Sequence, residues 1–128
     1  MILDSSAVVA VLQEEVGHEE LEQKMQGADV LAIGAPTLFE IGIVVVRQSG
    51  DSGRTAVDAF RAALDLVVIP FGESHREAAA QAFLRFGKGR HPAALNFGDC
   101  MTYATARVAD RPLLFIGNDF AQTDIEAA

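Results

Sequence analysis

The sequence lacks several residue types and segments that would point to particular classes of protein. It has no tryptophan, one tyrosine and a single cysteine, Cys100, which cannot form a disulfide within the chain. Such a chain is typical of the reducing cytoplasm, where we therefore expect this protein. Its most apolar run extends only from Ile41 to Val46, far short of the roughly 20 residues that cross a bilayer. The N-terminal Met1–Asp4 lacks the basic and apolar segments of a signal peptide, so we expect no contact with a membrane.

Basic residues are also scarce, because 10 Lys and Arg face 18 Asp and Glu and give a net charge of −8. Such a protein repels nucleic acid unless cations neutralise it locally. The length of 128 residues and the hydrophobic content of 50% suit one globular domain. No linker or internal repeat divides the sequence, so we expect a single domain over residues 1–128.

Four short apolar runs predict β-strands. They are Met1–Leu3, Val30–Ile33, Leu66–Ile69 and Leu113–Ile116. None of them alternates with polar residues, which is typical of strands buried on both faces of a parallel sheet. Segments with helical patterning separate the runs. This order predicts an α/β domain with a parallel sheet and right-handed crossovers.

Helical patterning covers most of the remaining sequence, namely Ser6–Gln13, His18–Gln26, Arg54–Leu64, a helix opening with the capping box Ser74–Glu77 and ending at Phe86, and Asp99–Ala109. The segment Leu38–Val46 is ambiguous, because its β-branched residues favour a strand. However, Pro36 precedes a possible capping pair of Thr37 and Glu40. We favour a helix that begins with Thr37 as its cap.

Acidic residues follow the ends of the predicted strands. Asp4 comes directly after the first strand, Glu40 shortly after the second and Asp119 after the last, while Asp99 begins a predicted helix. Ligands of open α/β sheets bind beyond the carboxyl ends of the strands. We therefore expect these four carboxylates to meet at one edge of the sheet.

Clustered carboxylates repel one another and raise one another's pKa, so the cluster requires a cation. Mg²⁺ and Mn²⁺ prefer such oxygen ligands, and a two-metal site hydrolyses phosphodiester bonds.

Each acid also has an ordinary structural interpretation. Asp4 suits a helix N-cap, Glu40 a capping box, Asp99 the positive end of a helix dipole and Asp119 a turn. These separate roles leave unexplained why all four are expected at the same edge of the sheet.

Three segments and one further acid carry a family resemblance, namely Met1–Ala7, Gly87–Cys100, Leu113–Ile125 and Glu40. They resemble the PIN-domain ribonucleases, and specifically the VapC toxins of bacterial toxin–antitoxin pairs, with Glu40 at the position of the family's second acid. The resemblance extends over essentially the whole chain. It implies a three-layer α/β PIN-like fold, in which helices flank a central parallel sheet of about five strands.

The resemblance also implies a function, namely that of a Mg²⁺- or Mn²⁺-dependent endoribonuclease toxin of a type II toxin–antitoxin system. A cognate VapB-type antitoxin would neutralise the toxin, which would be a homodimer. The implied catalytic and metal-binding residues are Asp4, Glu40, Asp99 and Asp119, with Ser6, Asn118 and Asp124 in support. Ser6 would orient Asp4 through its hydroxyl group. Ile116 departs from the family, because many relatives carry a polar residue there.

A basic segment precedes Asp99 and could offset the acidic charge where RNA binds. Its members are Arg85, Lys88, Arg90 and His91, which we interpret as a phosphate-binding surface at the edge of the site. The alternative is an ordinary solvated loop. Two divalent cations would neutralise the four clustered acids.

Other functions are compatible with parts of the sequence. A catalytically inactive PIN-fold module that binds RNA or protein is the main alternative. A receiver-like signalling domain fits poorly, because Pro70 rather than an aspartate follows Leu66–Ile69. The run Ile41–Val46 is either buried in the monomer or part of a subunit contact, and we favour a homodimer.

Overall fold

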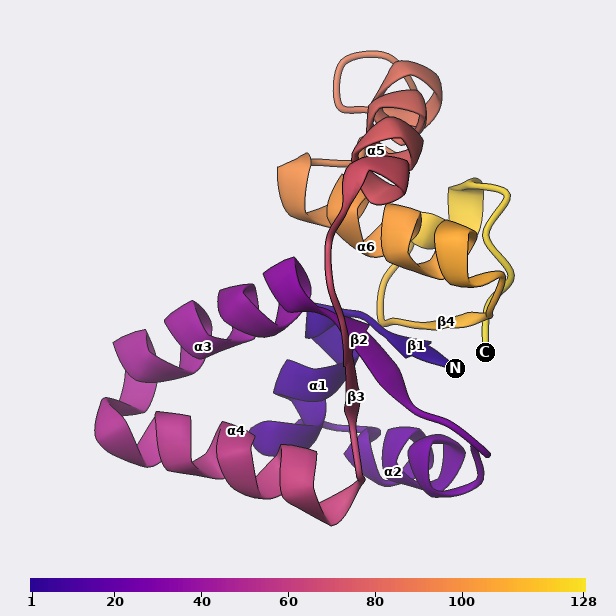
Figure 1. The fold of residues 1–128 in the computed structure, drawn as a ribbon. Coiled ribbons are helices and arrows are strands. Elements are labelled where there is room, and N and C mark those ends of the chain that lie inside the picture. The colour runs from indigo at the N-terminus through magenta and orange to yellow at the C-terminus, as the bar shows by residue number, and fades with distance from the viewer.

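Four short parallel strands form the centre of the structure, a computed structural model that describes residues 1–128 (Figure 1). The strands are β1 (Ile2–Leu3), β2 (Ala32–Gly34), β3 (Val67–Ile69) and β4 (Leu113–Leu114), in the order β3-β2-β1-β4. Ile2 of β1 lies between Ala32 of β2 and Leu113 of β4. All four predicted strands are present, each within about two residues of its expected position, and the predicted parallel sheet is confirmed.

The sheet has four strands rather than the five or so that the family resemblance implied. The C-terminal residues lie where a fifth strand would be. There, Leu113 donates its N–H to the carbonyl of Glu126 at 2.9 Å, and Ala128 donates to the carbonyl of Leu113 at 3.0 Å. These bonds make a single parallel bridge between Leu113 and Ala127. One bridge does not make a ladder, so the segment is not a strand.

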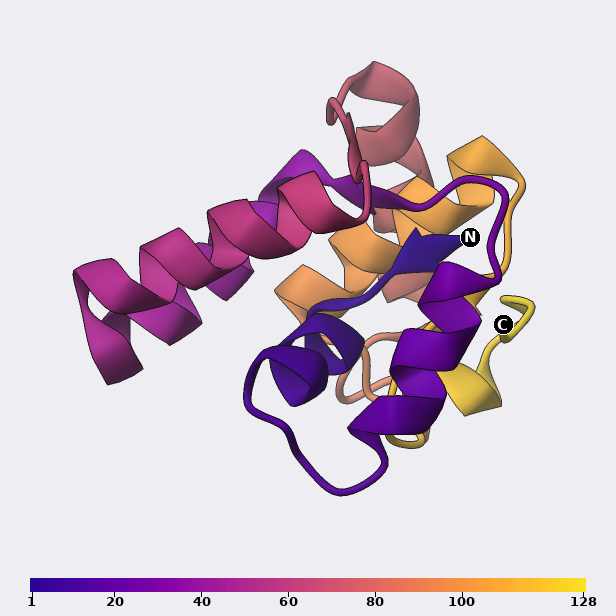
Figure 2. The same ribbon diagram turned by 90° about the horizontal axis from the view of Figure 1, so that it is seen from below.

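Six α-helices and one short 3₁₀ helix surround the sheet (Figures 1 and 2). They are α1 (Ser5–Leu12), α2 (His18–Gln26), α3 (Ala35–Ser49), α4 (Asp51–Ala63), α5 (Glu73–Phe86), α6 (Phe97–Ala109) and η1 (Phe120–Gln122). The ambiguous segment is therefore helical, within α3. Figures 1 and 2 both show α3 and α4 side by side as a hairpin that extends away from the sheet. None of the helices combines the length and the apolar character needed to span a membrane.

Two predicted helix caps are wrong by a few residues. Helix α3 begins at Ala35, with Gly34 as its N-cap and Pro36 in its first turn, where the fixed backbone angle of proline suits a helix start. Thr37 is therefore already inside the helix. Helix α5 begins at Glu73, and its cap is Gly72 rather than the predicted Ser74.

The sheet separates two hydrophobic cores, which gives the domain three layers. Successive residues of a strand point to opposite faces. Ile2 and Leu113 therefore pack in a core with α5 and α6, whereas Leu3 and Leu114 pack in a second core with α1 to α4. Burial on both faces is why β1 and β4 have continuous apolar sequences, whereas β3, at the edge of the sheet, is only partly buried.

A glycine allows the close approach of α3 and α4, and its replacement should reveal the cost of separating them. A Cβ on Gly53 of α4 would collide with the carbonyl group of Val45 on α3. We expect Gly53→Ala to destabilise the protein by about 1–3 kcal/mol, measured by thermal unfolding. Gly42 of α3 is the matched control, because a Cβ there meets nothing within 4 Å. Gly42→Ala should stabilise by up to about 1 kcal/mol. Equal effects of the two variants would contradict this account.

Candidate active site

Three of the four predicted acids line one cleft at the carboxyl edge of the sheet. Asp4 follows β1, Asp119 follows β4, and Asp99 lies in the first turn of α6. The cleft has a volume of about 260 Å³, and its other lining residues are Ser5, Ser6, Val9, Val44, Ile116 and Phe120. Glu40 approaches from α3, where its carboxylate lies against Gly98. A Cβ on Gly98 would be 3.1 Å from Oε2 of Glu40.

Asp4 is buried and held in a fixed orientation. It is 5% exposed and serves as the N-cap of α1. Its Oδ2 accepts hydrogen bonds from the backbone N–H of Ser6 at 3.0 Å and from the Ser6 hydroxyl at 2.6 Å. The Ser6 hydroxyl in turn accepts from the N–H of Ile116 at 3.0 Å, just after β4. The capping role and the predicted orienting contact of Ser6 are therefore both present. The backbone N–H of Ile116 makes the contact to Ser6, so this contact does not need a polar side chain at position 116.

Asp99 is fixed by a reciprocal pair of hydrogen bonds at the start of α6. Its Oδ2 accepts from the N–H of Asn96 at 2.8 Å, while its own N–H donates to Oδ1 of Asn96 at 2.9 Å. Burial raises the pKa of Asp99, the backbone hydrogen bond from Asn96 opposes that rise, and the charges of Asp4 and Asp119 add to it. The carboxylate is thus held in place within a field of like charges.

Glu40 on α3 experiences the same field of like charges. Burial raises its pKa, and the charges of Asp4 and Asp99 raise it further. Because Asp99 in turn responds to Asp119, the four carboxylates form one electrostatically coupled group. Such repulsion is unfavourable without a cation.

The chemistry of these groups suits a hard divalent cation. All four side chains offer carboxylate oxygens, which Mg²⁺ and Mn²⁺ prefer, and the cleft contains no histidine. The neighbouring Cys100 is a poor ligand, because burial and the charge of Asp99 raise its pKa to about 11. No three Asp, Glu, His or Cys side chains of the chain are close enough to hold one ion together. Coordination of one ion by three of the acids would therefore require these side chains to lie closer together than they do here.

Two of the predicted supporting residues, Asn118 and Asp124, lie in different parts of the structure. Asn118 is exposed beside Asp119. Asp124 is not part of the cleft but lines a separate hollow with Arg107. It accepts a hydrogen bond of 2.6 Å from the hydroxyl of Tyr103 and pairs with Arg85 at 3.0 Å. These two partners lower the pKa of Asp124, whereas burial and the bond to Asp124 raise the pKa of Tyr103 to about 12. Asp124 therefore fastens the C-terminal segment to α5 and α6.

The four predicted RNA-binding residues also differ in their contacts. Arg85 is paired with Asp124 and stacks over the ring of Phe86 at 4.6 Å. His91 accepts a hydrogen bond of 3.1 Å from a backbone N–H through Nδ1. Lys88 and Arg90 are both exposed. These two are the cations of the set most available to a phosphate group.

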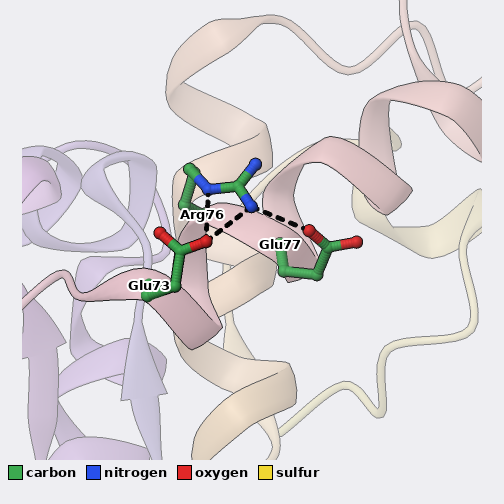
Figure 3. A network of polar contacts seen from close by, with 3 residues as sticks. All are labelled: Glu73, Arg76 and Glu77. Carbon is green, nitrogen blue, oxygen red and sulfur yellow. Dashed lines mark hydrogen bonds and ion pairs between the residues drawn. The ribbon is translucent and has the colours of Figure 1, made fainter.

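The basic surface does not continue to the start of α5. Figure 3 shows Arg76 between two glutamates, with hydrogen bonds of 2.9 and 2.6 Å to Glu73 and 2.9 Å to Glu77. All three side chains are exposed, so these ion pairs add little stability. They do neutralise Arg76.

Two features of the site had no clear signal in the sequence. One is Gly98, whose missing side chain leaves room for the Glu40 carboxylate. The other is a buried contact between the hydroxyl groups of Thr37 and Thr102. Both depend on how α3 and α6 meet in space, which no local pattern encodes.

Comparisons with known proteins agree on one family. The family model for the PIN domain matches residues 1–126. The chain is 50% identical over 127 residues to ribonuclease VapC36 of Mycobacterium tuberculosis, a match that covers 98% of this chain and 91% of the relative. It is 37% identical to ribonuclease VapC30 of the same species, with 98% and 95% covered.

Solved structures show the same fold at low sequence identity. The crystal structure of VapC20 from Mycobacterium tuberculosis, a toxin that cleaves the sarcin-ricin loop, superposes with a TM-score of 0.80 at 17% identity and covers 99% of this chain and 97% of that one. The VapBC2 complex of Rickettsia felis, bound to a promoter DNA fragment, gives a TM-score of 0.77 at 14% identity, with 99% and 96% covered.

Proposed function

This chain belongs to the VapC ribonucleases of the PIN-domain family, and we propose that it is the endoribonuclease toxin of a toxin–antitoxin pair. The observation that carries the proposal is the electrostatically coupled group of four carboxylates. Asp4, Asp99 and Asp119 line one cleft, and Glu40 lies against Gly98, next to Asp99 in the sequence. Asp4 is buried, accepts two hydrogen bonds and belongs to a group with three other carboxylates. This arrangement suits the cation-assisted hydrolysis of a phosphodiester.

We propose that Asp4, Glu40, Asp99 and Asp119 hold Mg²⁺ or Mn²⁺. The hydrogen bonds to Asp4 and Asp99 all go to Oδ2, so Oδ1 of each remains available as a ligand. A bound divalent cation would supply an activated water and neutralise charge on the phosphate group. Ser6 and Asn96 keep the two aspartates in place while the substrate binds. Asn118 would contribute to the polar rim beside Asp119.

The test of this function is RNA cleavage by the purified chain. We expect cleavage of a mixed cellular RNA with Mn²⁺ or Mg²⁺, and none when EDTA is in excess. Sequencing the new RNA ends would identify the target. Equal cleavage in EDTA would contradict the proposed chemistry. Binding of RNA without cleavage under any metal condition would instead identify an inactive binding module.

Lys88 and Arg90 are the proposed phosphate contacts, and their loss should weaken binding rather than chemistry. We expect the Lys88→Ala/Arg90→Ala variant to bind RNA about tenfold more weakly, with a shallower salt dependence, by roughly 0.7 in log–log slope for each lost contact. Arg76→Ala is the matched control, because Glu73 and Glu77 already neutralise that arginine. Fluorescence anisotropy at several salt concentrations gives the answer. An unchanged slope would exclude these contacts.

We propose that a cognate VapB-type antitoxin binds the groove between α3 and α4. The groove has a volume of about 590 Å³, and Phe39, Ile43 and Val46 in its lining are 71%, 39% and 47% exposed. Arg54 and Arg61 also line it, and Nε of Arg61 is buried without a hydrogen-bond partner. These features suit an amphipathic segment that carries a carboxylate.

A charge in the groove should separate the toxin from its antitoxin. We expect Ile43→Glu to remain folded, because the side chain is partly exposed, and to escape inhibition when the antitoxin is added. Inhibition of RNA cleavage is the readout. A variant that stays fully inhibited would place the antitoxin elsewhere.

We further propose that the chain is a homodimer, which light scattering of the isolated protein tests directly.

A further inference from the structure

Two threonine hydroxyl groups meet inside the protein where α3 contacts α6. Oγ1 of Thr37 and Oγ1 of Thr102 are 3.0 Å apart, and the residues are only 2% and 1% exposed. No other hydrogen bond between two side chains is fully buried in this chain. Packing alone does not require it, because two apolar side chains of the same shape can serve stability equally well.

The hydroxyl pair lies about one helical turn from two of the four carboxylates, one on each helix. Glu40 follows Thr37 by three residues on α3, and Asp99 precedes Thr102 by three residues on α6. Residues three apart share a helix face. The contact between the threonines therefore sets the distance between these two turns, and with it the separation of Glu40 and Asp99.

Gly98 gives independent support for this arrangement. The Glu40 carboxylate lies against its backbone, such that a Cβ would be 3.1 Å from Oε2 and 3.4 Å from Oε1. A Cβ at this position would require the carboxylate to shift by a few tenths of an ångström. Two contacts between α3 and α6, one turn apart, thus define where Glu40 lies relative to Asp99.

We propose that Thr37, Thr102 and Gly98 are positioning residues that set the spacing of Glu40 and Asp99 for cation binding. The inference rests on the proposed function of the cleft. A directional hydrogen bond resists the sliding of one helix along the other, whereas apolar contacts tolerate it. A displacement of about 1 Å at a reacting centre costs about 10²-fold in rate, so helix register is a catalytic requirement here.

The test compares Mn²⁺ affinity, activity and stability in matched variants. Thr37→Val/Thr102→Val removes the hydrogen bond without leaving an unpaired hydroxyl, so its melting temperature should stay close to that of the wild type. We expect calorimetric titration to show at least about tenfold weaker Mn²⁺ binding, and kcat to fall by about 10–100-fold with KM for RNA unchanged. Thr102→Ser keeps a hydroxyl group and should retain most of the affinity.

Two further variants separate positioning from general stability. Thr105→Val alters another buried threonine of α6, which bonds within its own helix at 2.9 Å, and should leave Mn²⁺ affinity unchanged. Gly98→Ala should weaken Mn²⁺ binding without lowering the melting temperature, even if the double valine variant fails to fold. Wild-type Mn²⁺ affinity in both the double valine variant and Gly98→Ala would overturn this inference alone. A wild-type protein that neither binds Mn²⁺ nor cleaves RNA would overturn the proposed function together with it.

Discussion

Asp99→Asn should abolish metal-dependent RNA cleavage while leaving the fold intact. Asparagine retains an oxygen that accepts the hydrogen bond from the N–H of Asn96, so the start of α6 is preserved. The negative charge that would hold a cation is lost. We expect kcat to fall by about 10²–10³-fold or more, the size of effect seen when one electrostatic contact to a transition state is removed. Single-turnover cleavage of a labelled RNA at saturating Mn²⁺ measures the loss.

The control for Asp99→Asn is a carboxylate of equal charge outside the cleft. Asp29 is exposed and precedes β2, at the opposite edge of the sheet from the four acids. Asp29→Asn should cleave RNA at the wild-type rate. Circular dichroism should show the same helix content for both variants. Full activity of a folded Asp99→Asn protein would remove Asp99 from the catalytic group.

Glu40→Gln should stabilise the protein in the absence of metal, even though it impairs the proposed activity. Burial and the charges of Asp4 and Asp99 raise the pKa of Glu40. The folded state therefore binds this proton more tightly than the unfolded state. The protonated group supports stability at low pH, and that contribution is lost as the pH rises through its folded pKa. Glutamine has no charge to lose, so the variant should melt at a higher temperature at neutral pH.

We expect an increase of roughly 2–5 °C for Glu40→Gln at pH 7 in EDTA, modest because solvent screens a partly exposed charge. The difference between variant and wild type should shrink as the pH falls toward 4. Added Mn²⁺ should raise the melting temperature of the wild type more than that of the variant. A variant that melts below the wild type at pH 7 would show that the four carboxylates do not repel one another as described.

The sequence by itself determined the strands, their parallel arrangement and the class of fold. Apolar runs without alternation are a local signal of strands buried on both faces, and Ile2 and Leu3 do face the two different cores. The positions of Asp4 and Asp119 at strand ends follow from the same pattern. Helix α3 was also predicted, although the capping pair of Thr37 and Glu40 places its cap at Thr37 rather than at Gly34.

The tertiary structure alone decided how the polar side chains pair. The family resemblance made Asp124 a supporting residue of the site, yet Tyr103 and Arg85 hold it elsewhere. The sequence pattern predicts Thr37 as a helix cap, but its hydroxyl group bonds across to Thr102, 65 positions away in the sequence. Hydrophobic periodicity reports which face of an element is buried, and it contains no information about which polar groups of distant elements meet there. That information exists only once α3 and α6 have packed against the sheet.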